Sequence, residues 1–254
     1  MEDAKKILHA STLAGEALLK SGAEIFRVQE TMSRIIEHYG VKNYNVYVIA
    51  NGIFANIDEN KESRRTAIRN VPLSGIHLGL IDRVNSISRE ICQDSYGIDE
   101  AIKKLEECQT PPPPRYLLEA AACGVGAASF GILFGAGAIE AVITFVLGAI
   151  LQLFLDWAHG ISKYLLYIAG AFIVTAGAAA MEAAKPVLDF NVIVIGAIIP
   201  MFPGVGLTTS IRELFNGDHV SGSIHLQDAV MTSVCIAVGV GTAIGVAGAL
   251  GGVL

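Results

Sequence analysis

Charged residues are scarce in this sequence, and the scarcity is confined to one part of it. Only 17% of the 254 residues are charged and 52% are hydrophobic, whereas a soluble domain carries about 25% charged residues. Residues 1–116 hold 15 of the 18 Lys and Arg and 16 of the 24 Asp and Glu, so residues 117–254 hold three and eight. This composition argues against one soluble domain or a disordered chain, and it predicts a soluble domain joined to a membrane domain.

The signatures of several other protein classes are missing as well. The net charge of −6 includes no basic stripe, so nothing in the sequence supports nucleic-acid binding. The four cysteines form no C-x-x-C pair, which argues against a zinc site and a disulfide framework. The first residues are polar, and no apolar signal-peptide core follows them. We therefore expect the charged part of the chain to stay in the cytosol.

Four consecutive prolines mark the boundary between the charged and the apolar part. Pro111 to Pro114 do not fit inside a helix and favour a stiff, extended spacer. The predicted organisation is a cytosolic α+β domain over 1–110, a proline spacer over 111–116 and a membrane domain over 117–254. In the first domain, hydrophobic patterns predict helices over 3–19, 24–39, 80–91 and 99–108, and strands near 45–50, 52–57 and 66–71. Asn51-Gly52 predicts a tight hairpin, and Ser21 and Glu24 have the spacing of a capping box.

No enzyme motif is found in this domain. There is no P-loop, no H-E-x-x-H and no G-x-S-x-G sequence. The histidines are isolated in sequence, and Arg64, Arg65 and Arg69 fit a charged strand edge better than an anion site. The sequence therefore predicts no catalytic residue, no cofactor and no metal, and it favours a transporter over an enzyme.

Five apolar segments follow the prolines, at 117–137, 139–155, 164–181, 190–207 and 228–250. A membrane span needs about 20 residues, with a range of about 17–25. The predicted fold is therefore a multi-pass α-helical membrane protein with about five transmembrane helices and an N-terminal cytosolic α+β domain. The Lys and Arg distribution places the N-terminus inside and the C-terminus outside the cytoplasmic membrane.

The fourth segment contains an interruption. Pro200, Pro203, Gly204 and Gly206 fall within seven residues and are expected to break the helix. Broken helices at membrane depth line cavities and build substrate sites in transporters. The spacing of Ser210 and Glu213 predicts that a short helix begins here, and its N-terminus could hold a substrate carboxylate beside Thr208, Thr209 and Arg212. Alternatively, Pro203-Gly204 simply ends the segment at the membrane surface.

Acidic residues near the segment ends are candidates for ion coupling. Glu182 and Asp189 bracket the loop into the broken segment, and Asp228 opens the last one. An acidic residue inside a membrane protein often carries a coupled proton, but an acid at a span end can also reach the interface at little cost.

Several short motifs together resemble the threonine/serine exporter family. The first part carries Leu19-Lys20-Ser21-Gly22-Ala23-Glu24-Ile25-Phe26-Arg27-Val28, then Arg69-Asn70-Val71-Pro72, then 78–90 with Asn85 and Arg89. The apolar part carries Pro203-Gly204-Val205, Ile211-Arg212-Glu213-Leu214 and Asn216-Gly217-Asp218-His219-Val220-Ser221-Gly222. The order and spacing of these motifs cover nearly the whole chain.

This resemblance implies an inner-membrane exporter of small amino acids (threonine or serine) or of small carboxylates such as succinate, driven by an ion gradient. Long members of the family carry about ten spans, so a chain with five is similar to the larger subunit of a split, two-component form. A second, shorter multi-pass membrane subunit and an oligomeric assembly in the lipid bilayer are expected. The alternatives are a membrane-anchored enzyme and a ligand-sensing protein whose cytosolic domain carries the activity.

Overall fold

The computed structural model describes residues 2–60, 63–72, 75–109, 115–158 and 160–249. The chain divides into two compact units. We call Met1–Pro112 with Thr208–His225 the N-terminal unit, and Pro113–Leu207 with Leu226–Leu254 the membrane unit. An α+β region followed by long apolar helices confirms the predicted fold class. The predicted spacer falls mostly on residues 110–114, which lie outside the described residues.

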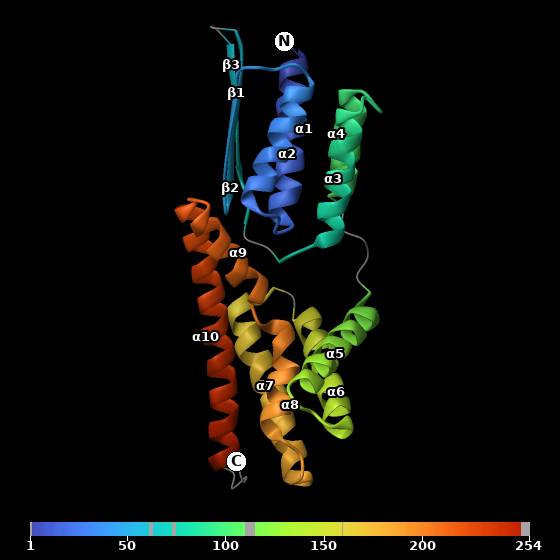
Figure 1. Ribbon diagram of the computed structural model, residues 1–254, viewed down its shortest axis with the longest axis vertical. Coiled ribbons are helices and arrows are strands. Elements are labelled where there is room, and N and C mark those ends of the chain that lie inside the picture. Colours follow the sequence, from blue (N-terminus) through green and yellow to red (C-terminus); the bar gives the residue numbers. More distant parts are fainter. Residues whose placement is uncertain (1, 61–62, 73–74, 110–114, 159, 250–254) are drawn as a thin grey trace. The chain divides into compact units, whose positions relative to one another are not determined.

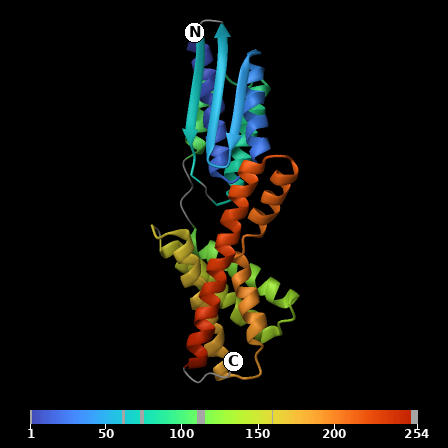
Figure 2. The same ribbon diagram turned by 90° about the vertical axis from the view of Figure 1, so that its left-hand side faces the viewer.

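The N-terminal unit pairs helices with one antiparallel sheet (Figure 1). Its helices and strands are α1 Glu2–Lys20, α2 Ile25–His38, β1 Tyr44–Ile49, β2 Gly52–Asn60, β3 Ser63–Asn70, α3 Leu78–Cys92 and α4 Ile98–Cys108. The strand order is β1-β2-β3, and Figure 2 shows the three strands in front of the helices. The predicted hairpin is confirmed, but Ile49 pairs with Gly52, so Ala50 and Asn51 form the turn.

The core of this unit lies between the sheet and the helices. Val48, Ile53 and Ile57 are buried on the inner sheet face, together with Met32 and Ile35 of α2. These apolar positions alternate along the strands, as expected for a sheet with one face on a core.

The predicted capping box at the start of α2 is wrong. Glu24 is the N-cap residue, but its side chain makes no capping hydrogen bond. The Ser21 hydroxyl donates instead to the carbonyl of Ala17 at 2.6 Å, because Ser21 directly follows α1. The carboxylate of Glu24 is thereby left for another partner.

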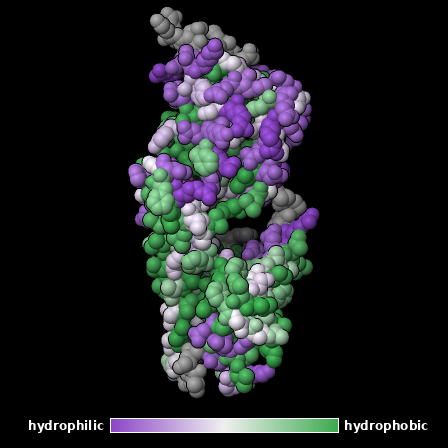
Figure 3. All heavy atoms as spheres, in the orientation of Figure 1, coloured by the Kyte–Doolittle hydropathy of each residue, from purple (hydrophilic) through white to green (hydrophobic). Residues whose placement is uncertain are grey.

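The rest of the chain is helical, both in the membrane unit and in Thr208–His225 of the N-terminal unit. They are α5 Tyr116–Leu133, α6 Ala138–Trp157, α7 Lys163–Ala184, α8 Phe190–Ile198, the 3₁₀ turn η1 Ile199–Met201, α9 Gly204–Phe215 and α10 His219–Ala249. In the described part of the chain, four helices are long and apolar enough to cross a membrane, or five if a bent pair counts as one span. Large apolar side chains such as Leu117 and Val142 are exposed on this unit, and Figure 3 shows hydrophobic residues over its surface.

Small residues let the membrane helices approach closely. A Cβ on Gly124 of α5 would lie 2.7 Å from the carbonyl oxygen of Phe145 in α6. A Cβ on Gly239 of α10 would lie 2.3 Å from the carbonyl oxygen of Ile168 in α7. Real side chains do not fit at such distances, so glycine is required at both crossings.

Candidate functional site

The predicted interruption of the fourth segment is present. α8 ends at Ile198, η1 follows, and α9 begins at Gly204, with a 56° bend between the two arms. Phe202 has an extended backbone, and its N–H donates to the carbonyl of Ile199 at 2.9 Å. Pro200 lies in the first turn of η1, and Pro203 immediately precedes α9. Both prolines therefore occupy positions where a missing N–H removes no helical hydrogen bond.

Of the four residues expected to break the helix, the two glycines do not form the turn. Gly204 and Gly206 lie in α9, and neither has a positive φ. A Cβ on Gly206 would lie 3.8 Å from the Cβ of Ala229, which is an ordinary contact. The chain turns at Ile199–Pro203 instead.

The predicted start of the following helix is also wrong. α9 begins at Gly204, so Ser210 and Glu213 lie inside it and form no capping box. The reason is that Pro203 already ends the extended segment and begins a new helix: its carbonyl accepts the N–H of Leu207 at 3.0 Å. Thr208 and Thr209 therefore lie on the second turn of α9 rather than before it, with Thr208 exposed and Thr209 half-buried.

Arg212 already has a partner within the N-terminal unit. Its guanidinium donates to the carboxylate of Glu24, at the start of α2. The other Glu24 oxygen lies 3.7 Å from Nε of Arg27. A substrate carboxylate at Arg212 would have to compete with Glu24.

A tight helical hairpin joins α9 to α10. Gly217 has a φ of +87°, and the N–H of Asp218 donates to the carbonyl of Glu213 at 3.0 Å, which is a glycine C-cap. Asp218 then caps α10, because its Oδ1 accepts the N–H of Ser221 at 3.0 Å. A Cβ on Gly222 would lie 2.8 Å from Leu214, so glycine permits the close return of the chain.

These caps correct the expected start of the last helix. α10 begins at His219, nine residues before the predicted Asp228. Hydropathy alone hid this start, because the first turns of α10 are polar. The glycine and aspartate of the hairpin were the signals that could have located it.

The hairpin also creates a buried polar pair that the sequence analysis missed. Nδ1 of His225 lies 2.7 Å from Oε2 of Glu213, whose side chain is only 7% exposed. The two residues are twelve positions apart, so only the turn between the helices brings them together.

None of the three acids predicted for ion coupling belongs to this pair, and two of them have defined partners. Asp228 accepts from Lys163 at 2.7 Å and from Tyr164 at 3.1 Å, which links α10 to α7. Asp189 caps α8 through the N–H of Asn191 at 2.9 Å. Glu182 is half-buried in the last turn of α7.

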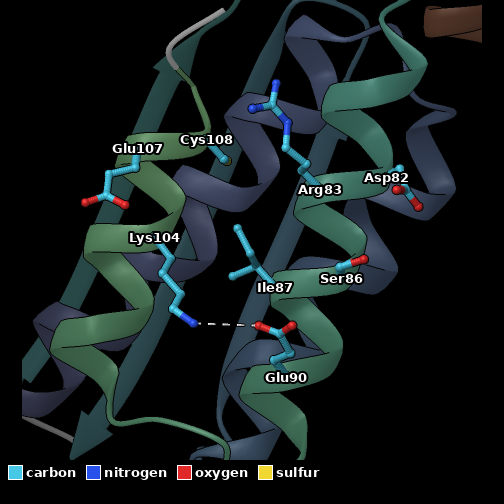
Figure 4. Close-up of a pocket in the computed structure, with 8 residues that line it drawn as sticks. All are labelled: Asp82, Arg83, Ser86, Ile87, Glu90, Lys104, Glu107 and Cys108. Atoms are coloured by element: carbon cyan, nitrogen blue, oxygen red, sulfur yellow. Dashed lines mark ion pairs between the residues drawn. The ribbon is translucent and has the colours of Figure 1, made fainter. Parts of the chain in front are cut away.

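A separate groove of about 400 Å³ lies between α3 and α4 (Figure 4). Charged groups of both signs line it, and Nζ of Lys104 lies 3.9 Å from a carboxylate oxygen of Glu90. Burial raises the pKa of the Cys108 thiol in this groove, so the thiol stays protonated at neutral pH. Among the described residues, no cluster of three or more His, Cys, Asp or Glu could hold a metal ion.

The apolar helices, the close glycine crossings and the broken span define a multi-pass membrane protein. The family model described as "Putative threonine/serine exporter" matches residues 9–247, so the chain belongs to the ThrE family. The predicted resemblance is thereby confirmed at the level of the family.

Two fission yeast proteins (Schizosaccharomyces pombe) are similar to this chain, and both are described as uncharacterized. Protein C7D4.12c is 24% identical over 233 residues, which is 88% of this chain and 31% of the relative. Protein C16A10.01 is 26% identical over 166 residues, which is 62% of this chain and 20% of the relative. The chain thus spans less than a third of the length of either relative. No solved structure matches it.

Proposed function

We propose that this chain is a subunit of an exporter that moves threonine, serine or a small carboxylate such as succinate out of the cytosol. The family match over residues 9–247 carries this proposal. The four to five candidate spans support it further, because one span would suffice to anchor an enzyme. The working unit includes a second, shorter multi-pass subunit, which supplies the spans that longer family members carry in one chain.

The broken span is the proposed substrate path. Its turn at Pro200–Pro203 leaves the helical hydrogen-bond pattern, and such irregular backbone at membrane depth is tolerated where it faces protein or water. Thr208 and Thr209 follow within two turns, and their hydroxyls suit the ammonium or carboxylate of a small amino acid. Glu182, Asp189 and Asp228 remain candidates for coupling transport to the driving ion.

The proposed orientation puts the N-terminal unit in the cytosol and the C-terminus outside the cytoplasmic membrane. Most Lys and Arg then lie inside, in agreement with the positive-inside rule.

Substrate retention in cells tests this function. Cells that express this chain together with the second, shorter subunit should accumulate less internal threonine, serine or succinate when fed the corresponding dipeptide or carbon source. Cells with either protein alone should retain the substrate. Equal retention in all strains at normal membrane abundance would refute export.

The groove between α3 and α4 supports a second candidate function, which is ligand sensing. Arg83 and Lys104 would suit the carboxylate of a free amino acid, and Glu90 and Glu107 would suit its ammonium group. Calorimetry on the full chain in nanodiscs should show threonine binding that Arg83→Gln abolishes and Arg34→Gln leaves intact. Binding that survives Arg83→Gln would exclude this groove.

A further inference from the structure

The last turn of α6 carries a carboxylate that is only half satisfied. Oδ1 of Asp156 accepts a side-chain N–H of Gln152, one turn earlier in the helix, at 2.9 Å. The other oxygen, Oδ2, is buried and has no hydrogen-bond partner in the part of the chain that the structure describes. A buried carboxylate oxygen is costly to leave without a donor, so this position suits a ligand that brings one.

Gln152 and Asp156 lie on the side of α6 that faces α5. A Cβ on Gly148 would lie 2.6 Å from the Cβ of Ala127 and 3.3 Å from the carbonyl oxygen of Cys123, so α6 packs against α5 at this glycine. Gln152 and Asp156 follow Gly148 at four-residue intervals and therefore continue the same side of the helix. The interface between α5 and α6 thus changes from close glycine packing to a polar end.

The polar groups at this end offer acceptors. A carboxylate only accepts hydrogen bonds, so the Gln152 amide turns its NH₂ group toward Asp156 and keeps its carbonyl oxygen for another donor. An ammonium group complements the two residues, because it has three N–H donors and a positive charge. A dicarboxylate such as succinate would meet like charge there.

No cation of the described chain fills this position. Lys163, at the start of the next helix, is paired with Asp228 at 2.7 Å. The described residues also include no cluster of three His, Cys, Asp or Glu that could hold a metal ion. Asp156 is half-buried and the adjacent Trp157 is 81% exposed, as is typical of an aromatic residue at the membrane interface. A ligand can therefore reach this end of α6 from the aqueous side.

This end of α6 also lies near the broken span. A Cβ on Gly170 of α7 would lie 2.8 Å from Leu151 of α6 and 3.3 Å from Met201 of η1, so both residues border the same glycine. Asp156 follows Leu151 by five residues, which is about 7.5 Å along a helix. In the proposed orientation α6 ends at the cytosolic face, so a substrate would meet Asp156 before it reached the break.

We propose that Asp156 and Gln152 bind the ammonium group of the exported amino acid at the cytosolic end of the substrate path. The inference rests on the export function proposed above. It adds the residues that recognise the charged amine, and it favours an amino acid over a dicarboxylate as the substrate of this chain.

Competition between threonine and 3-hydroxybutyrate, which is threonine without its ammonium group, tests the site. In proteoliposomes with the full chain and its partner subunit, unlabelled threonine should inhibit transport of radiolabelled threonine at a concentration at least about tenfold lower than 3-hydroxybutyrate does. Asp156→Asn keeps the size of the side chain but removes its charge, so it should abolish most of this difference. Asp156→Glu should retain part of it. Glu119→Gln, which changes an exposed acid in the first turn of α5, is the matched control and should keep the wild-type difference.

Two results of this competition would overturn the proposal. One is an unchanged preference for threonine in Asp156→Asn at normal membrane abundance. The other is an equal loss of affinity for threonine and for 3-hydroxybutyrate, which would indicate that Asp156 only stabilises the end of α6.

Tryptophan fluorescence separates this inference from the export function. Trp157 is the single tryptophan of the chain and directly follows Asp156. Threonine, but not 3-hydroxybutyrate, should change the emission of the full chain in lipid vesicles saturably, and Asp156→Asn should lose the response. If the wild type responds in this way but no substrate is moved, the export function fails and the ammonium site stands. If the wild type does not respond, or if it and Asp156→Asn respond alike, the site is refuted whatever the transport result.

Discussion

Arg212 forms an ion pair with Glu24, 188 positions earlier in the sequence. The pair joins the start of α2 to α9 within the N-terminal unit. Both residues lie in motifs on which the resemblance to the exporter family rests, and this contact joins those two motifs. Arg212 consequently has a structural partner in addition to its predicted role beside the substrate.

Charge reversal tests whether this pair matters. The Arg212 and Glu24 side chains are 60% and 24% exposed, so the attraction itself is worth only about 0–1 kcal/mol. Arg212→Glu should nevertheless reduce transport, because it places two carboxylates together. Adding Glu24→Arg to this variant should restore much of the lost transport. Arg34→Glu, another helical arginine paired with a glutamate, serves as the control, and failure of the double variant to recover would argue against the pair.

Gly239 should be intolerant of any side chain. A Cβ there would lie 2.3 Å from the backbone oxygen of Ile168, so Gly239→Ala must push α7 and α10 apart. Overpacking of this kind costs about 1–3 kcal/mol. Thermal unfolding in detergent should show a lower Tm for this variant. Gly241→Ala is the matched control, since a Cβ there meets nothing within 4 Å; equal Tm values would contradict the close crossing.

Restoring a continuous helix through the break should stop transport. Pro203→Ala with Gly204→Leu removes the helix start and the φ restraint that hold the bend. Membrane abundance should stay near normal while the transport rate falls by about tenfold or more, roughly 1.4 kcal/mol. Thr209→Val should raise the substrate concentration needed for half-maximal transport, whereas Thr242→Val on α10 should not. Normal transport by the Pro203→Ala, Gly204→Leu variant and by Thr209→Val would place the substrate path elsewhere.

Tyr96 should ionise later than an exposed tyrosine. Burial and the hydrogen bond to Glu90 raise its pKa above the usual value of about 10. Because the folded-state pKa is the higher one, this contribution to stability is complete below about pH 10 and is lost as pH rises toward the folded-state pKa. Absorbance titration of the full chain should show a late tyrosinate step that Tyr96→Phe removes and Tyr47→Phe leaves in place. Persistence of the late step in Tyr96→Phe would assign it to another residue.

The sequence predicts the order of the elements well, because each helix and strand has its own periodic pattern. The apolar segments (four or five candidate spans among the described residues), the hairpin near Gly52 and the break at Pro200 all follow from local signals. Hydropathy failed at the start of α10, where polar residues before Asp228 disguised a helix that Gly217 and Asp218 delimit. The capping-box spacing of Ser210 and Glu213 misplaced the start of α9, which begins at Gly204.

The polar contacts could not be predicted in the same way. The partners of Glu24 and Glu213 depend on where the chain returns in space, and spacing rules that suggested capping boxes for both were misleading. A buried acid twelve positions from a histidine becomes a pair only when the turn between two helices is known.

Reconstitution tests the central claim most directly. The purified chain, with its partner subunit, should move radiolabelled threonine, serine or succinate across a proteoliposome membrane faster than empty liposomes or liposomes with the Pro203→Ala, Gly204→Leu variant. We predict saturable transport of at least one of these substrates that depends on both subunits. If liposomes with correctly inserted protein released all three substrates no faster than empty liposomes, the assignment of this chain as an exporter subunit would be contradicted.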